Sequence, residues 1–443
     1  MTTLRGRRFH LLGIGGAGLS ALAELLLARG ACVSGCDVHR TPVTDRLVQR
    51  GAQVVTEGQD PGHVRGQDVL CHTTRLSPSG RVEVAAAQGA GLSVLDRPHL
   101  LASLIAETDA VGIAGTHGKT GTTAMVAHVL RELGQHPSSL VGDGASSRVV
   151  AAGTGVPGLL VAELDESDRT LPLHHPDCAL VTGVEFDHGD YYRDLDDVRA
   201  TFSAFLEGLP ESGLAVLCAD DAWLCAQPTP GRRLTYGFSE GADYRCLPDG
   251  RVELRGSGSP CTLTSLRLPV PGRHTLVNAT GALAVAVERG LEPPAVATAL
   301  ATFPGARRRL ERLGTWRGAT FYDDYGHLPQ QVRVTVDALR ELPHERVLLV
   351  FQPHRFSRYR VTRTEMVRAL AVADLVLCTE VYAAGEENPE GLSAAELAAK
   401  AGCAFAPDLD AVGAWLRRQV RAGDLVLLMG AGDIGKVWDV LAG

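Results

Sequence analysis

The chain has 443 residues and is 45% hydrophobic, which is enough for about three packed domains. Its formal net charge of −8 at pH 7 argues against a general nucleic-acid binder, because such proteins carry a basic face. The 10 cysteines include no Cys-x-x-Cys pair, and no uncharged stretch is as long as a membrane span. We therefore expect a cytoplasmic protein with reduced thiols, no membrane insertion and no nucleic-acid partner.

The first segment has the pattern of a nucleotide-binding βαβ unit. A strand is expected over Arg8–Leu12, followed by the G-x-G-x-x-G turn Gly13–Gly18, a helix over Leu19–Arg29 and a second strand over Ala31–Cys36. Asp37 stands at the end of that second strand, where dinucleotide-binding proteins place a ribose contact. Further short strands at residues 53–55, 69–71 and 94–95 extend this Rossmann-like domain to about residue 107.

The second segment opens on a phosphate-binding turn. Residues 109–114 predict a strand, residues 122–131 predict a helix, and Gly115-Thr-His-Gly-Lys119-Thr120 joins them. Lysine occurs three times among the 43 basic residues, and a compact ammonium at a Gly-rich turn suits a nucleotide phosphate. Backbone N–H groups at the helix start would cradle phosphates, and Thr120 is placed to offer its hydroxyl to Mg²⁺. Ile113 stands where the strict G-x-x-x-x-G-K-[ST] pattern needs glycine, so a bland turn with a helix cap is the alternative.

Two later strands end in acidic and imidazole side chains. Residues 159–162 lead into Glu163, and residues 179–184 lead into Glu185-Phe-Asp-His188. Ligands bind at the carboxyl ends of parallel strands, and carboxylate oxygen suits Mg²⁺. Glu163 and His188 are therefore candidate metal ligands, with a solvated acidic loop and a structural histidine as the alternatives.

The amino-acid composition changes in the rest of this segment. Residues 228–270 are broken by Pro, Gly and Ser and predict a small antiparallel excursion. A helix is expected over Val277–Arg289. Within it, the amide of Asn278 suits the edge of an adenine, although ordinary helix capping explains it as well.

The last segment, from residue 313, again alternates strands with helices. The strand 319–322 ends in Asp-Asp-Tyr325-Gly-His327, and the strand 347–351 ends in Gln-Pro-His-Arg355-Phe-Ser-Arg358. Both clusters lie at strand ends, so we expect them to share one cleft, in which two arginines capture a carboxylate. Structural salt bridges are the alternative. The three arginines at 307–309 would stabilise negative charge if they lie beside a reacting phosphate, and a solvated basic run is the alternative. Residues 430–435 repeat the G-x-G-x-x-G pattern.

Together these motifs resemble the Mur ligase family, in that family's order and over the whole chain. The similar blocks are residues 13–20, 115–120, 163–168, 323–329, 352–358, 380–386 and 430–436. The resemblance implies a three-domain α/β fold: an N-terminal Rossmann-like domain for a UDP-sugar (1–107), a central P-loop-type ATPase with a mostly parallel sheet (108–312) and a C-terminal Rossmann-like domain for an amino acid (313–443).

Within that family the chain resembles the alanine-adding branch. The resemblance implies that ATP activates the lactyl carboxylate of UDP-N-acetylmuramate as an acyl phosphate, which the amine of L-alanine attacks, with Mg²⁺ as cofactor. This is a step of peptidoglycan precursor synthesis, carried out by a monomer or homodimer. Related branches use a carbamylated lysine, and Lys119 is the sole lysine of residues 1–399, which agrees with the alanine-adding branch.

The resemblance also assigns residues. It implies an ATP site of Gly115, Thr116, Gly118, Lys119, Thr120, Thr122, His274 and Asn278, and metal ligands Thr120, Glu163 and His188. The UDP-sugar would contact Gly15, Gly16, Gly18, Ser20 and Asp37, and L-alanine would contact Tyr325, His327, Arg355 and Arg358. Catalytic roles fall to Lys119, His188, Arg308, Arg309 and His327.

Three other functions stay open at this point. A recycling ligase would add a preformed peptide to the same sugar nucleotide, and an NAD(P) oxidoreductase would use the two G-x-G-x-x-G turns. A non-catalytic nucleotide-binding regulator is the third, because the chain departs from the family pattern at Gly121, Gly183, Thr275 and Leu328.

Overall fold

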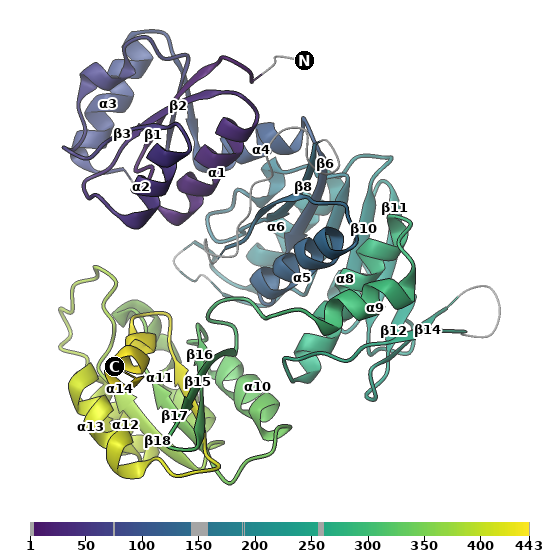
Figure 1. Ribbon diagram of the computed structural model, residues 1–443, viewed down its shortest axis with the longest axis vertical. Helices are drawn as coiled ribbons and strands as arrows, with labels where there is room; N and C mark the ends of the chain where they lie inside the picture. Colours follow the sequence, from purple (N-terminus) through teal and green to yellow (C-terminus); the bar gives the residue numbers. More distant parts are fainter. Residues whose placement is uncertain are drawn as a thin grey trace. The chain divides into compact units, whose positions relative to one another are not determined.

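The computed structural model describes residues 4–73, 76–142, 158–187, 189, 191–255 and 261–442. They form two compact units, one of Met1–Arg267 with Val277–Phe303 and one of Leu268–Leu276 with Pro304–Gly443. The first unit holds a five-stranded and a nine-stranded sheet, and the second holds a six-stranded sheet (Figure 1). These sheets confirm the three-domain α/β fold. No helix in the described ranges has the length and apolar character needed to cross a membrane.

The N-terminal sheet is parallel and has the order β3-β2-β1-β4-β5. Its order reverses beside β1, which lies between β2 and β4, and the turn at residues 13–18 follows β1 at that switch point. Ligands of open α/β sheets bind at such a point. The elements are β1 (Arg8–Leu12), α1 (Ala17–Ala28), β2 (Cys32–Cys36), α2 (Pro42–Gln49), β3 (Gln53–Val55), η1 (Pro61–Val64), β4 (Val69–His72), α3 (Pro78–Gly89), β5 (Ser93–Asp96) and α4 (Arg97–Ile105).

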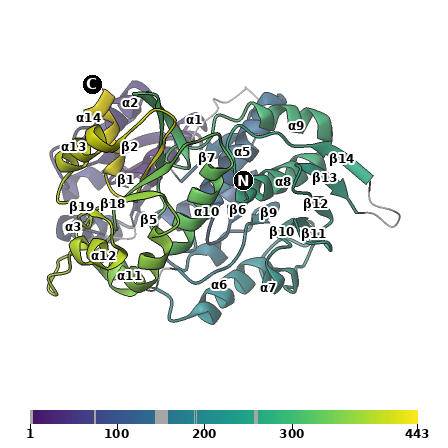
Figure 2. The ribbon, with the colours of Figure 1, turned by 90° about the horizontal axis from the view of Figure 1, so that it is seen from below.

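The central sheet has the order β14-β13-β12-β11-β10-β9-β6-β8-β7 (Figures 1 and 2). Strand β6 lies between β8 and β9, so the carboxyl ends of all three meet at the phosphate turn. The strands are β6 (Asp109–Ala114), β7 (Ser138–Leu140), β8 (Leu159–Glu163), β9 (Cys178–Val181), β10 (Leu214–Cys218), β11 (Arg232–Gly237), β12 (Tyr244–Cys246), β13 (Arg251–Leu254) and β14 (Cys261–Ser265). The helices are α5 (Lys119–Glu132), η2 (Leu171–Leu173), α6 (Leu195–Glu207), α7 (Ala222–Cys225), α8 (Arg273–Glu288) and α9 (Pro293–Ala301).

Three predictions for this sheet change in detail. Strand β9 ends at Val181 rather than 184, because the next residues hydrogen-bond to the phosphate turn instead of continuing the ladder. The antiparallel excursion is confirmed for β12, β13 and β14, whereas β11 and β12 pair in parallel. Helix α8 begins at Arg273, one turn before the expected start.

The C-terminal sheet has the order β15-β16-β20-β17-β18-β19, with β15 antiparallel to β16. Its residues alternate between two cores, which α10, α11 and α12 close on one face and α13 and α14 on the other. The elements are β15 (Glu311–Trp316), β16 (Ala319–Asp324), α10 (Pro329–Arg340), β17 (Val347–Phe351), α11 (Phe356–Leu370), β18 (Leu375–Thr379), α12 (Ala394–Ala401), β19 (Ala404–Ala406), α13 (Leu409–Gln419), β20 (Leu425–Met429), η3 (Ile434–Lys436) and α14 (Val437–Ala442).

Two features of this unit differ from the sequence analysis. Strand β15 was not expected, and the border drawn between residues 312 and 313 falls inside it. Its sequence lacks an alternating apolar pattern, and its pairing with β16 shifts register between Arg312 and Gly314. The second G-x-G-x-x-G turn opens the 3-10 helix η3, which the six-residue helix α14 follows.

Candidate active site

The phosphate turn joins β6 to α5 through backbone shapes that require glycine. Gly115 has φ +130° and Gly118 has φ +82°, a region that side-chain-bearing residues rarely adopt. A Cβ on Gly115 would overlap the Thr182 hydroxyl, and Gly118 packs against the amide of Asn278. Gly118 is also the N-cap of α5 and offers no capping side chain. The first N–H groups of that helix therefore face the turn as an anion site.

The segment that follows β9 holds this turn in place. The hydroxyl of Thr182 donates to the carbonyl of Ala114 at 3.2 Å. The N–H of Thr116 donates to the carbonyl of Gly183 at 2.9 Å, and its hydroxyl bonds to the backbone of Glu185. Gly183 has φ +148°, which accounts for glycine at this departure from the family pattern.

Lys119 lies against a buried carboxylate at the base of the turn. Its ammonium donates to both oxygens of Glu166 at 2.9 and 2.7 Å, and to the carbonyl of Gly115 at 2.7 Å. The side chains of Lys119 and Glu166 are 13% and 1% exposed. Burial disfavours the charge on Lys119, but Glu166, Asp165 and Glu163 outweigh it and raise the pKa, so the ammonium keeps its proton.

Two oxygen-bearing side chains meet beside the turn. The hydroxyl of Thr120 donates to Glu163 Oε1 at 3.2 Å, and Glu163 Oε2 accepts the N–H of Gly142 at 2.7 Å. A hydroxyl and a carboxylate are hard donors that suit Mg²⁺. The structure thus brings together two of the three predicted metal ligands, whereas His188 lies outside the described residues.

The remaining predicted ATP contacts lie on α5 and α8. Thr122 is fully buried on α5, and its hydroxyl has no hydrogen-bond partner within the described part of the chain. Asn278 touches the turn through Gly118. His274 lies one turn earlier on α8 and is exposed.

The first G-x-G-x-x-G turn is closed by Asp37. Its carboxylate accepts the N–H groups of Gly15 and Val38, both at 2.8 Å, and so holds the shape of the turn. A Cβ on Gly18 would overlap the guanidinium of Arg97 at the start of α4. Ser20 is buried in the first turns of α1. The loop thus combines backbone N–H groups with a cation, a pairing that suits a diphosphate.

Two of the residues predicted to bind L-alanine, Tyr325 and His327, belong to a row of aromatic rings in the C-terminal unit. The ring of His327 lies 5.8 Å from that of Tyr325 and 5.8 Å from that of His354, which stacks on Tyr382. Arg358 approaches His354 Nδ1 at 3.3 Å. Burial and the nearby arginines Arg358 and Arg355 lower the pKa of His354 to about 4, so this ring is neutral at pH 7.

Arginines enclose the first ring of that row. The guanidinium groups of Arg308 and Arg309 lie 5.0 and 5.3 Å from the centre of the Tyr325 ring, close enough for cation–π contact. Arg308 also pairs with Asp323 at 3.2 Å and donates to the carbonyl of Gly430 at 2.6 Å. Arg355 has φ +62° at the N-cap of α11, a strained backbone that fixes where its side chain begins.

Several participants were not assigned from the sequence. Glu166 stood in the acidic run after Glu163, but nothing in the pattern said which carboxylate would face Lys119. Tyr382 belongs to a block that resembles the family but has no predicted role, whereas His354 belongs to a strand-end cluster that is expected to share one cleft with His327, as the two rings do. Arg97 had no signal, and its Nε is buried without a hydrogen-bond partner among the described residues.

Comparison with known proteins identifies the family. Three family models match the chain: "Mur ligase family, catalytic domain" over 8–108, "Mur ligase middle domain" over 113–286 and "Mur ligase, glutamate ligase domain" over 308–432. The UDP-N-acetylmuramate–L-alanine ligase of Acidothermus cellulolyticus is 40% identical, with 96% of this chain and 92% of that protein covered. The enzyme of the same name from Rubrobacter xylanophilus is 37% identical, with 98% and 99% covered. The chain belongs to the Mur ligase family.

Solved structures agree with this membership. The UDP-N-acetylmuramate-alanine ligase of Thermotoga maritima has 25% identity and a TM-score of 0.78, with 98% of each chain covered. A murein peptide ligase from Psychrobacter arcticus, 22% identical with a TM-score of 0.67, shares the fold over 99% of this chain and 98% of that chain. Mur ligases form amide bonds with ATP. The oxidoreductase hypothesis therefore loses its basis, and Asp37 is already bonded to its own turn.

Proposed function

We propose that this Mur ligase joins L-alanine to the lactyl carboxylate of UDP-N-acetylmuramate in an ATP-dependent reaction. The observation that carries the proposal is the near full-length similarity to enzymes of that name, together with a phosphate turn whose lysine is held charged. ATP and a UDP-sugar as substrates, with ten cysteines that are all free, favour the cytoplasm.

Each domain has a proposed task. The segment 1–107 would bind the UDP-sugar through Gly15, Gly16, Gly18, Ser20 and Asp37, with Arg97 facing the diphosphate. The segment 108–312 would bind ATP through Gly115, Thr116, Gly118, Lys119, Thr120, Thr122, His274 and Asn278. The segment 313–443 would hold L-alanine through Tyr325, His327, Arg355 and Arg358.

Magnesium fits the donors beside the phosphate turn. Thr120 and Glu163 would hold it, with His188 as the third predicted ligand, because hydroxyl and carboxylate oxygens lie within 3.2 Å of one another there. When bound, Mg²⁺ neutralises charge on the nucleotide phosphates.

The residues of this chain have defined work in the reaction. A carboxylate is a poor acyl donor, so it must first accept the γ-phosphoryl group, and phosphate then leaves when the amine attacks. Lys119 would bind the transferred phosphoryl oxygens as a point charge, and Arg308 and Arg309 would stabilise the same negative charge. Arg355 and Arg358 would hold the carboxylate of L-alanine, which orients its amine, and His327 is the candidate acceptor of the amine's proton.

The decisive experiment measures phosphate release from ATP by the purified chain. With UDP-N-acetylmuramate and Mg²⁺ present, release should require L-alanine, and mass spectrometry should find UDP-N-acetylmuramoyl-L-alanine. A tripeptide that replaces alanine with higher kcat/KM would identify a recycling ligase instead. ATP binding without turnover for any amino acid or peptide would leave a nucleotide-binding regulator.

A further inference from the structure

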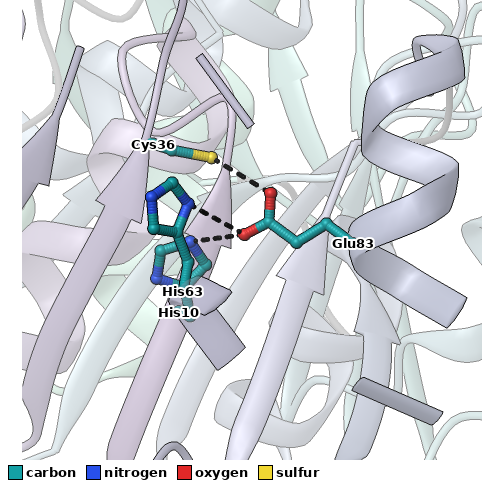
Figure 3. A group of neighbouring side chains, drawn as sticks. All are labelled: His10, Cys36, His63 and Glu83. Atoms are coloured by element: carbon teal, nitrogen blue, oxygen red, sulfur yellow. Dashed lines mark hydrogen bonds and ion pairs between the residues drawn. The ribbon is translucent and has the colours of Figure 1, made fainter. Parts of the chain in front are cut away.

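Four potential metal ligands meet inside the N-terminal domain, away from the phosphate turn (Figure 3). His10 comes from β1, Cys36 from the end of β2, His63 from η1 and Glu83 from α3. One ligand atom from each residue lies within 4.8 Å of all the others. His10 is 2% exposed, while Cys36 and Glu83 are fully buried, so the cluster is closed to water on most sides.

The polar atoms at the centre of the cluster lie close together without forming a hydrogen bond. His10 Nε2 and Glu83 Oε1 lie 3.0 Å apart as an ion pair, but neither atom has hydrogen-bond geometry to any partner in the described part of the chain. Buried polar atoms of this kind are rare and need an explanation, such as an ion.

Hydrogen bonds around the cluster orient its two imidazole rings. Ser34 donates its hydroxyl hydrogen to the carbonyl of Phe9 at 3.2 Å, so its oxygen accepts from His10 Nδ1 at 2.9 Å. A neutral imidazole that donates from Nδ1 has its lone pair on Nε2, and a hydrogen bond on the other ring nitrogen is what orients metal-bound histidines. His63 Nδ1 lies 3.4 Å from Glu83 Oε1 and also accepts a long bond from the N–H of Asp60 at 3.4 Å, a contact that a zinc ion bound to Nδ1 would replace.

We propose that His10, Cys36, His63 and Glu83 form a closed zinc site. A thiol, two imidazoles and one carboxylate form a donor set of intermediate softness that suits Zn²⁺ and not Mg²⁺. Tetrahedral zinc with bonds of about 2.0 to 2.3 Å holds its ligand atoms about 3.3 to 3.8 Å apart. Glu83 Oε1 lies 3.0 Å from His10 Nε2 and 3.4 Å from His63 Nδ1, and Glu83 Oε2 lies 3.7 Å from Cys36 Sγ.

The charges balance as well. A thiolate and a carboxylate together neutralise Zn²⁺, and the site stays uncharged as a whole. Zinc binding would release the proton of the Cys36 thiol to solvent as the Zn–S bond forms.

The site would tie four elements of the domain together behind the UDP-sugar turn. The carbonyl of Cys36 accepts the N–H groups of Gly13 at 2.8 Å and Ile14 at 3.2 Å. A metal that fixes Cys36 would therefore fix the start of the glycine turn. This is a structural role, because four protein ligands leave no open coordination position.

The test uses the full-length chain, stripped of metal and then titrated with Co²⁺ or Zn²⁺. Co²⁺ should give a thiolate-to-cobalt charge-transfer band and tetrahedral d–d bands that saturate at about one equivalent. Zn²⁺ should displace that signal and raise the melting temperature of the metal-free chain. Neither readout depends on ligase activity, so the zinc site and the proposed function can fail separately.

Matched variants decide which residues bind. Cys36→Ser should lose the charge-transfer band, whereas Cys32→Ser on the same strand and Cys71→Ser on β4 should keep it. His63→Gln, on the partly exposed helix η1, should fold as judged by circular dichroism and lose the thermal stabilisation by zinc. The proposal would be overturned if the chain gave no cobalt–thiolate band, or if the band survived Cys36→Ser. The four residues would then form a hydrogen-bonded cluster without a metal.

Discussion

Removing the charge of Lys119 tests how the phosphate turn is supported. Lys119→Met keeps the length of the side chain but takes away both hydrogen bonds to Glu166, whose side chain is 1% exposed. A buried carboxylate left without its partner destabilises the folded state by about 3 to 5 kcal/mol. For a domain of roughly 200 residues, each kcal/mol shifts the melting temperature by about 2 to 4 °C. The variant should therefore melt roughly 6 to 20 °C lower.

The deficit should also depend on pH. Burial already raises the pKa of Glu166, and the charge of Lys119 is the largest influence that opposes this rise, so its loss raises the pKa further. The folded variant then binds this proton more tightly than the unfolded chain, whose glutamate titrates near its ordinary value of about 4.3. Lost stability must return as pH falls and be largest at high pH. Differential scanning calorimetry between about pH 8 and about pH 5 measures this gap against the unchanged chain.

Two controls separate this cause from general damage. Lys400→Met alters an exposed lysine on α12 and should stay within about 0.5 kcal/mol of the unchanged chain. Glu166→Gln added to Lys119→Met removes the stranded charge and should recover most of the loss. A Lys119→Met chain that melts normally at high pH, or whose deficit grows on acidification, would refute the ion-pair reasoning.

Three further variants test the proposed site. Lys119→Arg should nearly abolish alanine-dependent phosphate release, because the planar guanidinium is bulkier than an ammonium. The control Lys400→Arg should keep normal phosphate release. A normal kcat in Lys119→Arg would contradict the role assigned to Lys119. Gly115→Ala should prevent nucleotide binding in calorimetric titration, because Gly115 has φ +130° and its added Cβ would overlap the side chain of Thr182. The Cβ of Gly121→Ala meets open space inside α5, so that control should stabilise the chain by about 0.5 to 1 kcal/mol. Arg358→Lys should raise the KM for L-alanine about tenfold, which corresponds to about 1.4 kcal/mol for a lost bidentate hydrogen bond. The KM for ATP should stay unchanged. A raised KM for ATP with an unchanged KM for L-alanine would place Arg358 at the nucleotide.

The sequence predicts the phosphate turn well because its parts are contiguous. The strand before Gly115, the turn itself and the helix after it are read off one stretch, and parallel pairing of β8 with β6 then brings Glu163 to the same edge. Which acidic residue faces Lys119 depends on how the chain turns after β8. The residues between Glu163 and Glu166 fix that turn by packing, and packing leaves no periodic signal.

The zinc cluster shows the opposite case. His10 and Cys36 stand inside apolar strands, where each reads as an ordinary core residue, and His63 and Glu83 belong to a 3-10 helix and a helix farther along. No two of the four share an element, so no ligand spacing exists for a pattern to detect. Strand β15 was missed for a related reason, since its antiparallel pairing with β16, and not an apolar pattern of its own, makes it a strand.

The surroundings of Lys119 explain why this position holds a lysine in a chain that otherwise uses mostly arginine. The acceptors around Lys119 Nζ are Gly115 O, Thr116 O and the two oxygens of Glu166, which converge on one point from several directions. A compact ammonium can serve such a set with its three hydrogens, whereas a guanidinium directs its donors in one plane. Three hydrogens already face four acceptors, so a phosphate oxygen must displace one of them. The bond to Thr116 O is the longest at 3.4 Å and therefore the first to yield, which leaves Glu166 to keep the ammonium charged while it turns to the nucleotide.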